Sequence, residues 1–317
     1  FVSGTDCYGS PIDEGYRKAV EAGTFSGTLT DYVEANHEAQ AAAMRDYEIS
    51  LDLFEGSGLG ICKAKHEQVT ADVIRRLHDN GFLEKRATAQ FYDEKAGCFL
   101  NGRQVVGRCP VQGCKSEKAY ADECDLGHQY MPADLIAPKS TITGETPAMR
   151  DVSNWYFKLP DFAPLLRDHV AYLESRSDTR KVVTDTISEF LVPPVLYIKN
   201  ELEGDYRVIA ASLPAHEFHA AEKGKASFEL EFPDVESRDV ARAQLSRADI
   251  RFRGGKALVP FRITGNISWG VPAPQLDDDG EKLTVWCWPE SLWAPISFTR
   301  AYLEDVKGCS DDEWRNY

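Results

Sequence analysis

Four residues with metal-binding side chains stand close together in the middle of the chain, in the order Cys109-x4-Cys114-x9-Cys124-x3-His128. Three thiolates and one imidazole, supplied as two pairs from short turns, are a typical ligand set for tetrahedral zinc. A glycine precedes both Cys114 and His128 and gives the backbone the freedom that such turns need. Because four protein ligands leave no coordination position open, we expect Zn²⁺ with a structural role.

Two other interpretations of this cluster stay open. Asp125 or a water molecule could complete a three-cysteine site in place of His128, or the cysteines could be unrelated thiols beside a surface histidine. The other five of the eight cysteines are scattered singly, unlike the dense disulfide framework of a small extracellular protein. The pattern favours a reducing compartment, and we expect a cytoplasmic protein.

The bulk properties are those of a globular protein without a membrane partner. The chain has 317 residues, which favours two domains, and a formal net charge of −15 with no basic block. A surface this acidic does not hold phosphate backbones by its overall field, so any tRNA contact has to be local. No apolar run of about eighteen residues and no signal-peptide pattern is present.

The elements that must position the cluster follow an α/β pattern. Helical periodicity covers residues 14–44, with a break near 23–28, and residues 66–80, while residues 47–58 alternate like a short strand. Residues 82–147 carry short strands, turns and the cysteines, and residues 157–173 are again helical. Residues 192–261 are strand-rich (VLYIKN, YRVIAAS, ASFELEF, KALVPFRI) with one helix at 237–248, and residues 263–298 read as strand and turn.

Six segments, in order, resemble the methionyl-tRNA synthetase family of class I aminoacyl-tRNA synthetases. FVSGTDCYGSPI at the start is similar to the family's Gly-Thr-Asp-Glu-His-Gly-Thr-Pro-Ile turn. The segments around the cysteines, FYDEKAGCFLNGRQVVGRCP and ADECDLGHQYMPADLIAPKSTITGETP, resemble the approaches to its zinc knuckle. NWYFKLPDF, ITGNISWGVPAP and LTVWCWPESLWAPISFT resemble its helix entry, its Trp-Gly-Val-Pro turn and its pocket strand.

This resemblance implies a Rossmann-like parallel sheet split by an inserted zinc-knuckle domain. Residues 1–84 and 261–317 would form the two parts of the catalytic domain, 85–160 the knuckle domain and 161–200 a helical return. Residues 201–260 would be a β-rich insert of unknown role. The activity implied is amino-acid activation with ATP and Mg²⁺ followed by transfer to tRNA. Asp6 would hold the α-amino group of methionine or an analogue, and Trp286 and Trp293 would line the side-chain pocket.

The sequence also departs from the family pattern. Cys7 and Tyr8 replace the Glu and His of the first motif, and Gly265–Asn266 replaces an Arg-Asp pair. Neither the HIGH motif nor the KMSKS motif occurs in these residues, so no catalytic residue is assigned and the chain alone is expected to be inactive. The opening at Phe1 suggests a fragment. The alternative is an inactive paralogue that binds an amino acid, tRNA or a protein.

Three further groups carry weaker signals. His216 and His219, with Glu217 beside them, could be two metal ligands, but no third ligand is evident. The acidic run at residues 277–280 fits a solvated hairpin turn better than a calcium loop. Cys7, in a Gly-rich turn, would be a nucleophile only with a lowered thiol pKa.

Overall fold

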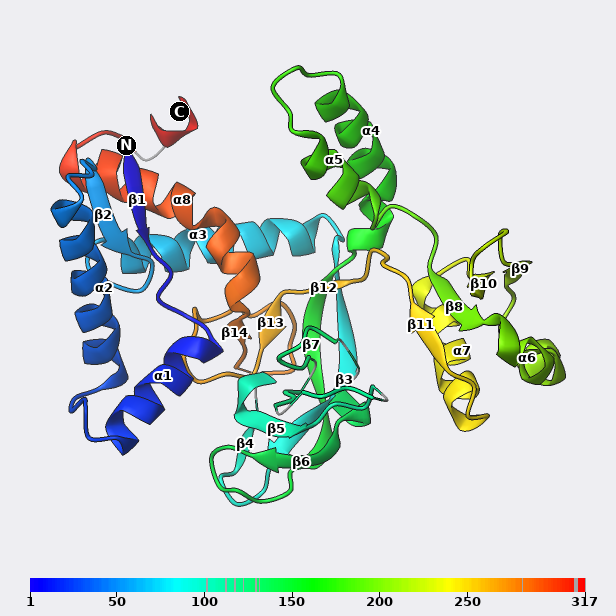
Figure 1. The fold of residues 1–317 in the computed structure, drawn as a ribbon. Coiled ribbons are helices and arrows are strands. Elements are labelled where there is room, and N and C mark those ends of the chain that lie inside the picture. Colours follow the sequence, from blue (N-terminus) through cyan, green and yellow to red (C-terminus); the bar gives the residue numbers. More distant parts are fainter. Residues whose placement is uncertain are drawn as a thin grey trace. The chain divides into compact units, whose positions relative to one another are not determined.

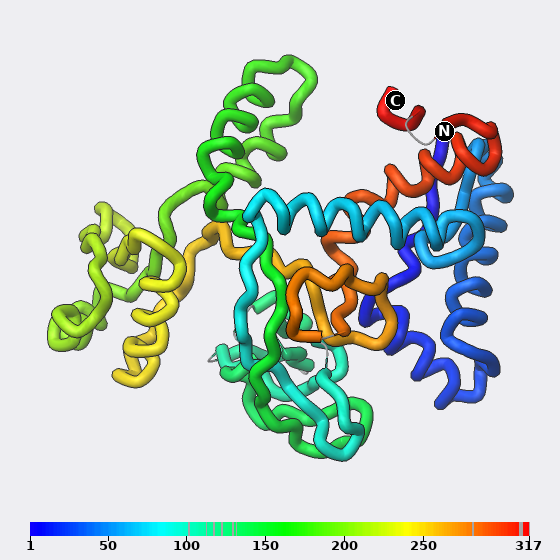
Figure 2. Tube along the Cα trace, turned by 180° about the vertical axis from the view of Figure 1, so that it is seen from behind, coloured from blue at the N-terminus to red at the C-terminus, as the bar shows by residue number. Residues whose placement is uncertain are grey.

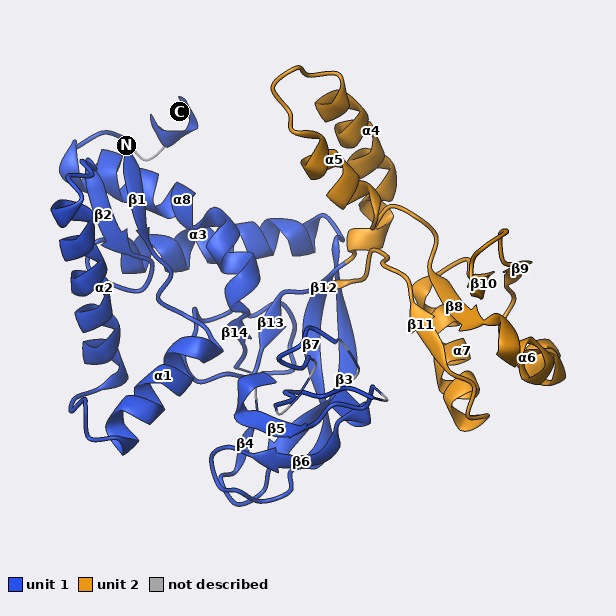
Figure 3. Ribbon diagram, in the orientation of Figure 1, with its two compact units in different colours: residues 1–157, 262–317 blue, residues 158–261 orange. Residues whose placement is uncertain are grey.

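The structure is a computed structural model that describes residues 1–100, 102–111, 113–116, 118–121, 123–128, 130, 132–280, 282–310 and 313–316. The chain divides into two compact units (Figure 3). Unit 1 comprises residues 1–157 and 262–317, and unit 2 comprises residues 158–261. Within the described residues, none of the helices is long and apolar enough to cross a membrane.

Unit 1 begins with a parallel strand pair flanked by helices. Strand β1 (Val2–Thr5) pairs in parallel with β2 (Leu53–Gly56), so both strands end at the same edge. Helix α2 begins at a capping box, in which Thr28 and Asp31 each bond the other's backbone N–H. The helices of unit 1 are α1 (Ser10–Glu21), α2 (Leu29–Asp46), α3 (Cys62–Asp79) and α8 (Cys287–Ala301).

Helices α3 and α8 lie side by side against this strand pair (Figures 1 and 2). The buried residues of α8 recur every three or four positions and form one stripe, which packs on Cys62 of α3 and on Val2 and Leu53 of the strands. A Cβ on Gly4 would lie 2.4 Å from the ring of Phe298. The close approach of α8 to β1 therefore requires glycine at this position.

The remaining strands of unit 1 form antiparallel sheets. The longest pairing joins β3 (Leu83–Asp93) to β7 (Ala148–Phe157), in a sheet of order β12-β7-β3-β4. The short strands β5 and β6 flank the cysteine cluster, and β13 pairs with β14 just before α8. Their bounds are β4 (Cys98–Phe99), β5 (Val105–Arg108), β6 (Ile136–Ser140), β12 (Phe261–Arg262), β13 (Thr264–Gly265) and β14 (Thr284–Val285).

Unit 2 contains a helical pair and a four-stranded antiparallel sheet covered by two helices. The sheet has the order β11-β8-β10-β9, and α6 and α7 contribute Tyr206, Ala241 and Leu245 to the core on one of its faces. The elements are α4 (Ala163–Glu174), α5 (Lys181–Ser188), β8 (Val195–Lys199), α6 (Glu203–Ile209), β9 (Glu217–His219), β10 (Ser227–Glu231), α7 (Val235–Arg247) and β11 (Phe252–Gly254).

Three strand predictions are wrong. Residues 206–212 are helical because Leu202, Tyr206 and Ile209, spaced by three and four, all pack on one core. Residues 256–263 form strand only at β12, which begins directly after Pro260. Residues 287–301 form α8 rather than strand and turn, since Pro289 falls in the first turn, where a proline removes no intrahelical hydrogen bond. The insert at 201–260 is thus helix and strand together.

Candidate functional site

Asp6 lies immediately after the carboxyl end of β1, at the edge where β2 also ends. Its Oδ1 accepts a hydrogen bond from the backbone N–H of Tyr8 at 3.1 Å, which fixes the carboxylate in a tight turn. The backbone N–H of Cys7 donates to Oγ of Ser57, just beyond β2, at 3.0 Å. In open α/β folds, ligands bind outside the carboxyl ends of the strands. Asp6 is exposed at this edge and can therefore meet a ligand.

A buried hydrogen-bond chain lies next to Asp6. Oε2 of Glu290 on α8 is 2.6 Å from Nε2 of His66 on α3, and Nδ1 of His66 is 2.9 Å from Oγ of Ser297. Because an ionised carboxylate only accepts, Nε2 of His66 is the donor to Glu290, and Nδ1 shares a hydrogen bond with the Ser297 hydroxyl. The side chains of His66 and Glu290 have no exposed surface. The second oxygen of Glu290, Oε1, finds no hydrogen-bond partner among the described residues.

Asp6 and Glu290 are close enough for each to shift the pKa of the other. The pKa of Glu290 is raised, first by burial, which the hydrogen bond from His66 opposes and the charge of Asp6 reinforces. The pKa of Asp6 is also raised, first because the surrounding protein removes water from its carboxylate. Two adjacent carboxylates either share a proton or require a cation. No lysine or arginine of the described chain forms an ion pair with either of them, so we call this pair the acidic site.

Aromatic rings and thiols surround the acidic site. The ring of Tyr8 stacks on His66 with centroids 6.4 Å apart and lies 5.6 Å from the ring of Trp269. Burial raises the pKa of the Cys287 thiol to about 11, and the charges of Asp6 and Glu290 add to this effect. Burial likewise raises the pKa of Cys7, which disfavours the thiolate that a nucleophile needs.

The two predicted pocket tryptophans have partners other than Asp6. Trp286 caps the N-terminus of α8, and its ring lies under the guanidinium of Arg262 at 4.7 Å. Trp293, on α8, donates from Nε1 to Oγ1 of Thr70 at 2.7 Å. In the part of the chain that the structure describes, neither ring has a recorded contact with Asp6. The structure thus joins Asp6 to Glu290 and His66, and not directly to these rings.

Arg262 places a positive charge beside Gly265, where the family pattern has arginine. Its Nη2 lies 3.6 Å from the position that a Cβ on Gly265 would take, and its Nε donates to the carbonyl of Thr264 at 2.7 Å. Burial lowers the pKa of Arg262. The sequence indicated that no guanidinium would lie near residue 265. The structure places one there, because Arg262, three residues before Gly265, points to that position.

The four predicted zinc ligands converge on one point in unit 1. The ligand atoms of Cys109, Cys114, Cys124 and His128 all lie within 4.8 Å of one another. Sγ of Cys114 is 4.0 Å from Sγ of Cys124 and 3.2 Å from Nδ1 of His128. Metal–ligand bonds of about 2.3 Å in a tetrahedron place neighbouring sulfurs about 3.8 Å apart. These donors therefore fit a tetrahedral ion such as zinc.

The environment of Cys124 favours the thiolate that a metal needs, while that of Cys109 favours the thiol. Burial opposes ionisation of Cys124, but the backbone N–H groups of His128 and Leu126, with the Cys109 and His128 side chains, lower its pKa to about 6. Burial raises the pKa of Cys109 to about 11. Asp125, the alternative ligand, instead accepts a hydrogen bond from Ser116.

The weaker candidates have other roles. His216 bonds Tyr206 and the carbonyl of Pro214, so it does not pair with His219. His219 instead lies with the exposed Glu217 and the half-buried Glu231. The acidic turn at residues 277–280 holds Lys85, whose Nζ is 2.8 Å from Asp277.

Sequence reasoning missed His66, Glu290 and Ser297 as site residues. His66 and Glu290 are 224 positions apart and belong to no common motif. The one available signal was that Glu290 stands within LTVWCWPESLWAPISFT, one of the six segments that resemble the family.

Residues 1–197 match the sequence pattern of the family described as tRNA synthetases class I (M). The chain belongs to this family. It is a divergent member of the methionyl-tRNA synthetases. A methionine–tRNA ligase of Parabacteroides distasonis is 35% identical to this synthetase chain over 167 residues, which are 52% of the chain and 23% of that relative. The chain thus spans less than a quarter of the curated relative it matches.

Two solved structures are similar to this synthetase chain at low identity. Mycobacterium tuberculosis methionyl-tRNA synthetase bound by methionyl-adenylate is 14% identical, with a TM-score of 0.43 over 96% of this chain and 40% of that one. A LeuRS–tRNA–LeuAMS complex from Agrobacterium radiobacter is 10% identical, with a TM-score of 0.44 over 94% of this chain and 49% of that one.

Proposed function

We propose that this chain forms the amino-acid-binding core of a methionyl-type aminoacyl-tRNA ligase. The complete protein activates methionine or an analogue with ATP and Mg²⁺ and transfers it to tRNA. Residues 1–84 and 261–317 are the two parts of its catalytic domain, residues 85–160 are the zinc-knuckle domain, and residues 161–200 return the chain between them. Zn²⁺ on Cys109, Cys114, Cys124 and His128 has a structural role.

The acidic site is the observation that carries this proposal. An α-ammonium group has three N–H donors and one positive charge. Asp6 is exposed at the strand edge and can accept from it, while the buried Glu290 adds its negative charge from behind. Hydrogen bonds to charged groups contribute about 1.5–3 kcal/mol each. The site is therefore suited to hold the ammonium end of an amino acid.

Activation needs more than this site. Adenylate formation is phosphoryl chemistry, which proteins accelerate by positioning and by electrostatic stabilisation. Arg262, beside Gly265, can supply one positive charge, but these 317 residues contain neither HIGH nor KMSKS. We therefore propose that the chain alone does not form aminoacyl-adenylate.

Methionine-dependent pyrophosphate exchange into ATP tests this function. The 317-residue chain should show no exchange, whereas a longer natural protein that contains both ATP motifs should exchange. In that longer protein, Asp6→Asn should lower kcat/KM for methionine by about tenfold or more, because the ammonium loses a charged acceptor. Asp72→Asn, on the surface of α3, is the matched control and should change nothing. If the longer protein shows no exchange, the proposed ligase activity is wrong. If the 317-residue chain shows exchange, the proposal that it is inactive alone is wrong.

A further inference from the structure

The sheet of unit 2 has one open face. Strands and helices alternate as β8, α6, β9, β10, α7 and β11, and every recorded strand pairing is antiparallel. Leu196 and Ile198 of β8 and Leu230 of β10 point into the helix-covered core. Because successive side chains of a strand alternate between faces, Tyr197 and Glu229 point to the other face. Four-stranded sheets that recognise RNA use this arrangement, with bases stacked on rings of the open face.

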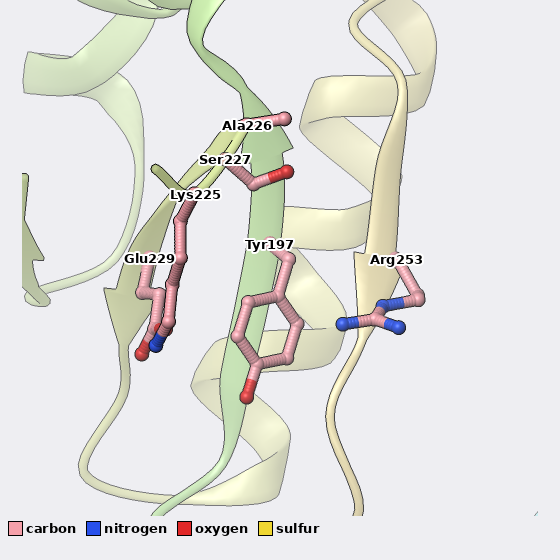
Figure 4. Close-up of a pocket in the computed structure, with 6 residues that line it drawn as sticks. All are labelled: Tyr197, Lys225, Ala226, Ser227, Glu229 and Arg253. Carbon is pink, nitrogen blue, oxygen red and sulfur yellow. The ribbon is translucent and has the colours of Figure 1, made fainter. Parts of the chain in front are cut away.

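The open face is hollowed around Tyr197 (Figure 4). The hollow has a volume of about 340 Å³ and is lined by Tyr197, Lys225, Ala226, Ser227, Glu229 and Arg253. This volume is at the lower end of ligand-binding clefts, which start at roughly 300 Å³. Its one aromatic ring stands on the central strand β8, between side chains from β10 and β11. A flat π-surface, a hydroxyl and two cations are thereby gathered on one sheet face.

The cations beside Tyr197 are available to a ligand. The guanidinium of Arg253 lies over the Tyr197 ring in a cation–π contact, 4.8 Å from its centre, and forms no ion pair within the described chain, so a base stacks on the ring by displacing it or from the opposite side. Lys225 is exposed and lies 3.1 Å from Glu222 and 4.0 Å from Glu229. Exposed ion pairs of this kind contribute only about 0–1 kcal/mol to stability. Lys225 can therefore leave these glutamates and contact a phosphate group instead.

The sequence of these strands partly matches the RNA-recognition pattern. That pattern reads Lys/Arg-Gly-aromatic-Gly/Ala-aromatic-Val-x-aromatic on the third strand. Residues 225–232 here read KASFELEF, with the first lysine and the last phenylalanine in place. The two outward aromatic positions are Ser227 and Glu229, so Tyr197 is the ring left for stacking. Glu229, Glu231 and the β9 residue Glu217 make the β9 side acidic, so the cations left for a polyanion are Arg253 on β11 and Lys225 just before β10.

We propose that this open face binds a single-stranded RNA segment. One base stacks on Tyr197, the flanking phosphates contact Arg253 and Lys225, and Ser227 is placed to meet a ribose 2′-hydroxyl. The site belongs to unit 2 alone and does not depend on the ligase function. Since the whole chain has a net charge of −15, binding is local and weakens with salt.

Fluorescence anisotropy of a labelled eight-nucleotide single-stranded RNA, titrated with the full chain at several salt concentrations, tests this site. Wild type should bind, and Tyr197→Ala should weaken binding by about tenfold, the effect of losing one stacked base. Tyr197→Phe keeps the ring and should stay within about twofold of wild type. Arg253→Ala should reduce the slope of log affinity against log salt by about one. Tyr172→Ala is the matched control, because Tyr172 is an exposed ring beside an arginine on α4.

Several results would overturn the proposal. These are no binding at about 100 µM protein and low salt, an unchanged affinity in Tyr197→Ala, or equal affinity for duplex RNA, in which the bases are already stacked. Equal binding of AMP would indicate a small-molecule pocket, and equal binding of the same DNA sequence would remove the role of the 2′-hydroxyl. Thermal unfolding of each variant shows that a loss of binding is not a loss of fold.

Discussion

Glu290 is the residue whose environment demands most explanation. A fully buried carboxylate is costly unless its oxygens are hydrogen-bonded, and here His66 satisfies one of the two. The His66 ring is in turn held by Ser297, so the chain of hydrogen bonds fixes Glu290 toward Asp6. Glu290 is therefore a costly buried group whose negative charge lies next to that of Asp6.

Glu290→Gln tests the cost of this burial through the pH dependence of stability. Because the pKa of Glu290 is raised above its ordinary 4.5, the folded state holds this proton more tightly than the unfolded state. Wild-type stability from this group is therefore complete below pH 4.5 and is lost as the pH rises through the raised pKa. The uncharged glutamine avoids this loss. Urea unfolding should show the variant gaining stability relative to wild type between pH 4.5 and pH 8.

Glu304→Gln is the control, because the pKa of Glu304 is shifted in the opposite direction to that of Glu290. Burial raises the pKa of Glu304, but hydrogen bonds from Lys65 and Arg300 outweigh it, so the net pKa is lowered. This variant should lose about 1–3 kcal/mol at neutral pH, and the loss should fade as the pH falls through the lowered pKa. If the unfolding free energies of both variants change with pH in the same way relative to wild type, the pKa of Glu290 is not raised in the folded state.

Individual site residues differed in how far the sequence could predict them. The cysteines and Asp6 stood in short motifs, and the structure brings the four metal ligands together as their spacing indicated. His66 and Glu290 meet only because α3 packs on α8. No local pattern encodes such a contact, so it could not be predicted from the sequence.

At the scale of elements, helices with a clear apolar period were the most predictable. The predicted helices at 66–80 and 237–248 correspond to α3 and α7. Helix α8 was missed because its prolines and tryptophans are typical of turns and strands. Packing against β1 and α3 stabilises the helical conformation of α8. The stripe of buried residues on α8 became visible only in the structure.

The knuckle between β5 and β6 is expected to depend on its metal. Its core is small and includes Cys124 with the half-buried Cys109 and Cys114. We expect one Zn²⁺ per chain and loss of hydrogen-exchange protection in residues 105–140 after chelation, because small metal domains fold with their ion. Cys114→Ser should weaken zinc binding at least tenfold by removing one ligand.

Cys98→Ser is the control for the knuckle prediction. Cys98 packs against the same core but is not one of the four converging ligands. Zinc content and affinity should match wild type in this variant. Protection that survives chelation, or a Cys114→Ser protein with full zinc affinity, would contradict a structural metal.

At the scale of the whole molecule, two units carry two different chemistries. Unit 1 holds the acidic site and the knuckle, and unit 2 holds a sheet face with an aromatic ring and cations. The sequence indicated the family across its motifs, but it could not assign residues 201–260. That stretch resembles no segment of the family, and the βαββαβ order of residues 195–254 emerged only in the structure.

Calorimetric titration of the 317-residue chain with methionine, without ATP, measures whether the acidic site binds an amino acid through its ammonium group. Methionine should bind, and its desamino analogue, 4-(methylthio)butanoate, should not, because the acidic site holds the ammonium group. Asp6→Asn should weaken methionine binding by about tenfold or more, while Asp72→Asn should not. Equal binding of methionine and the desamino analogue, or an Asp6→Asn protein with wild-type affinity, would show that the acidic site does not hold the ammonium group.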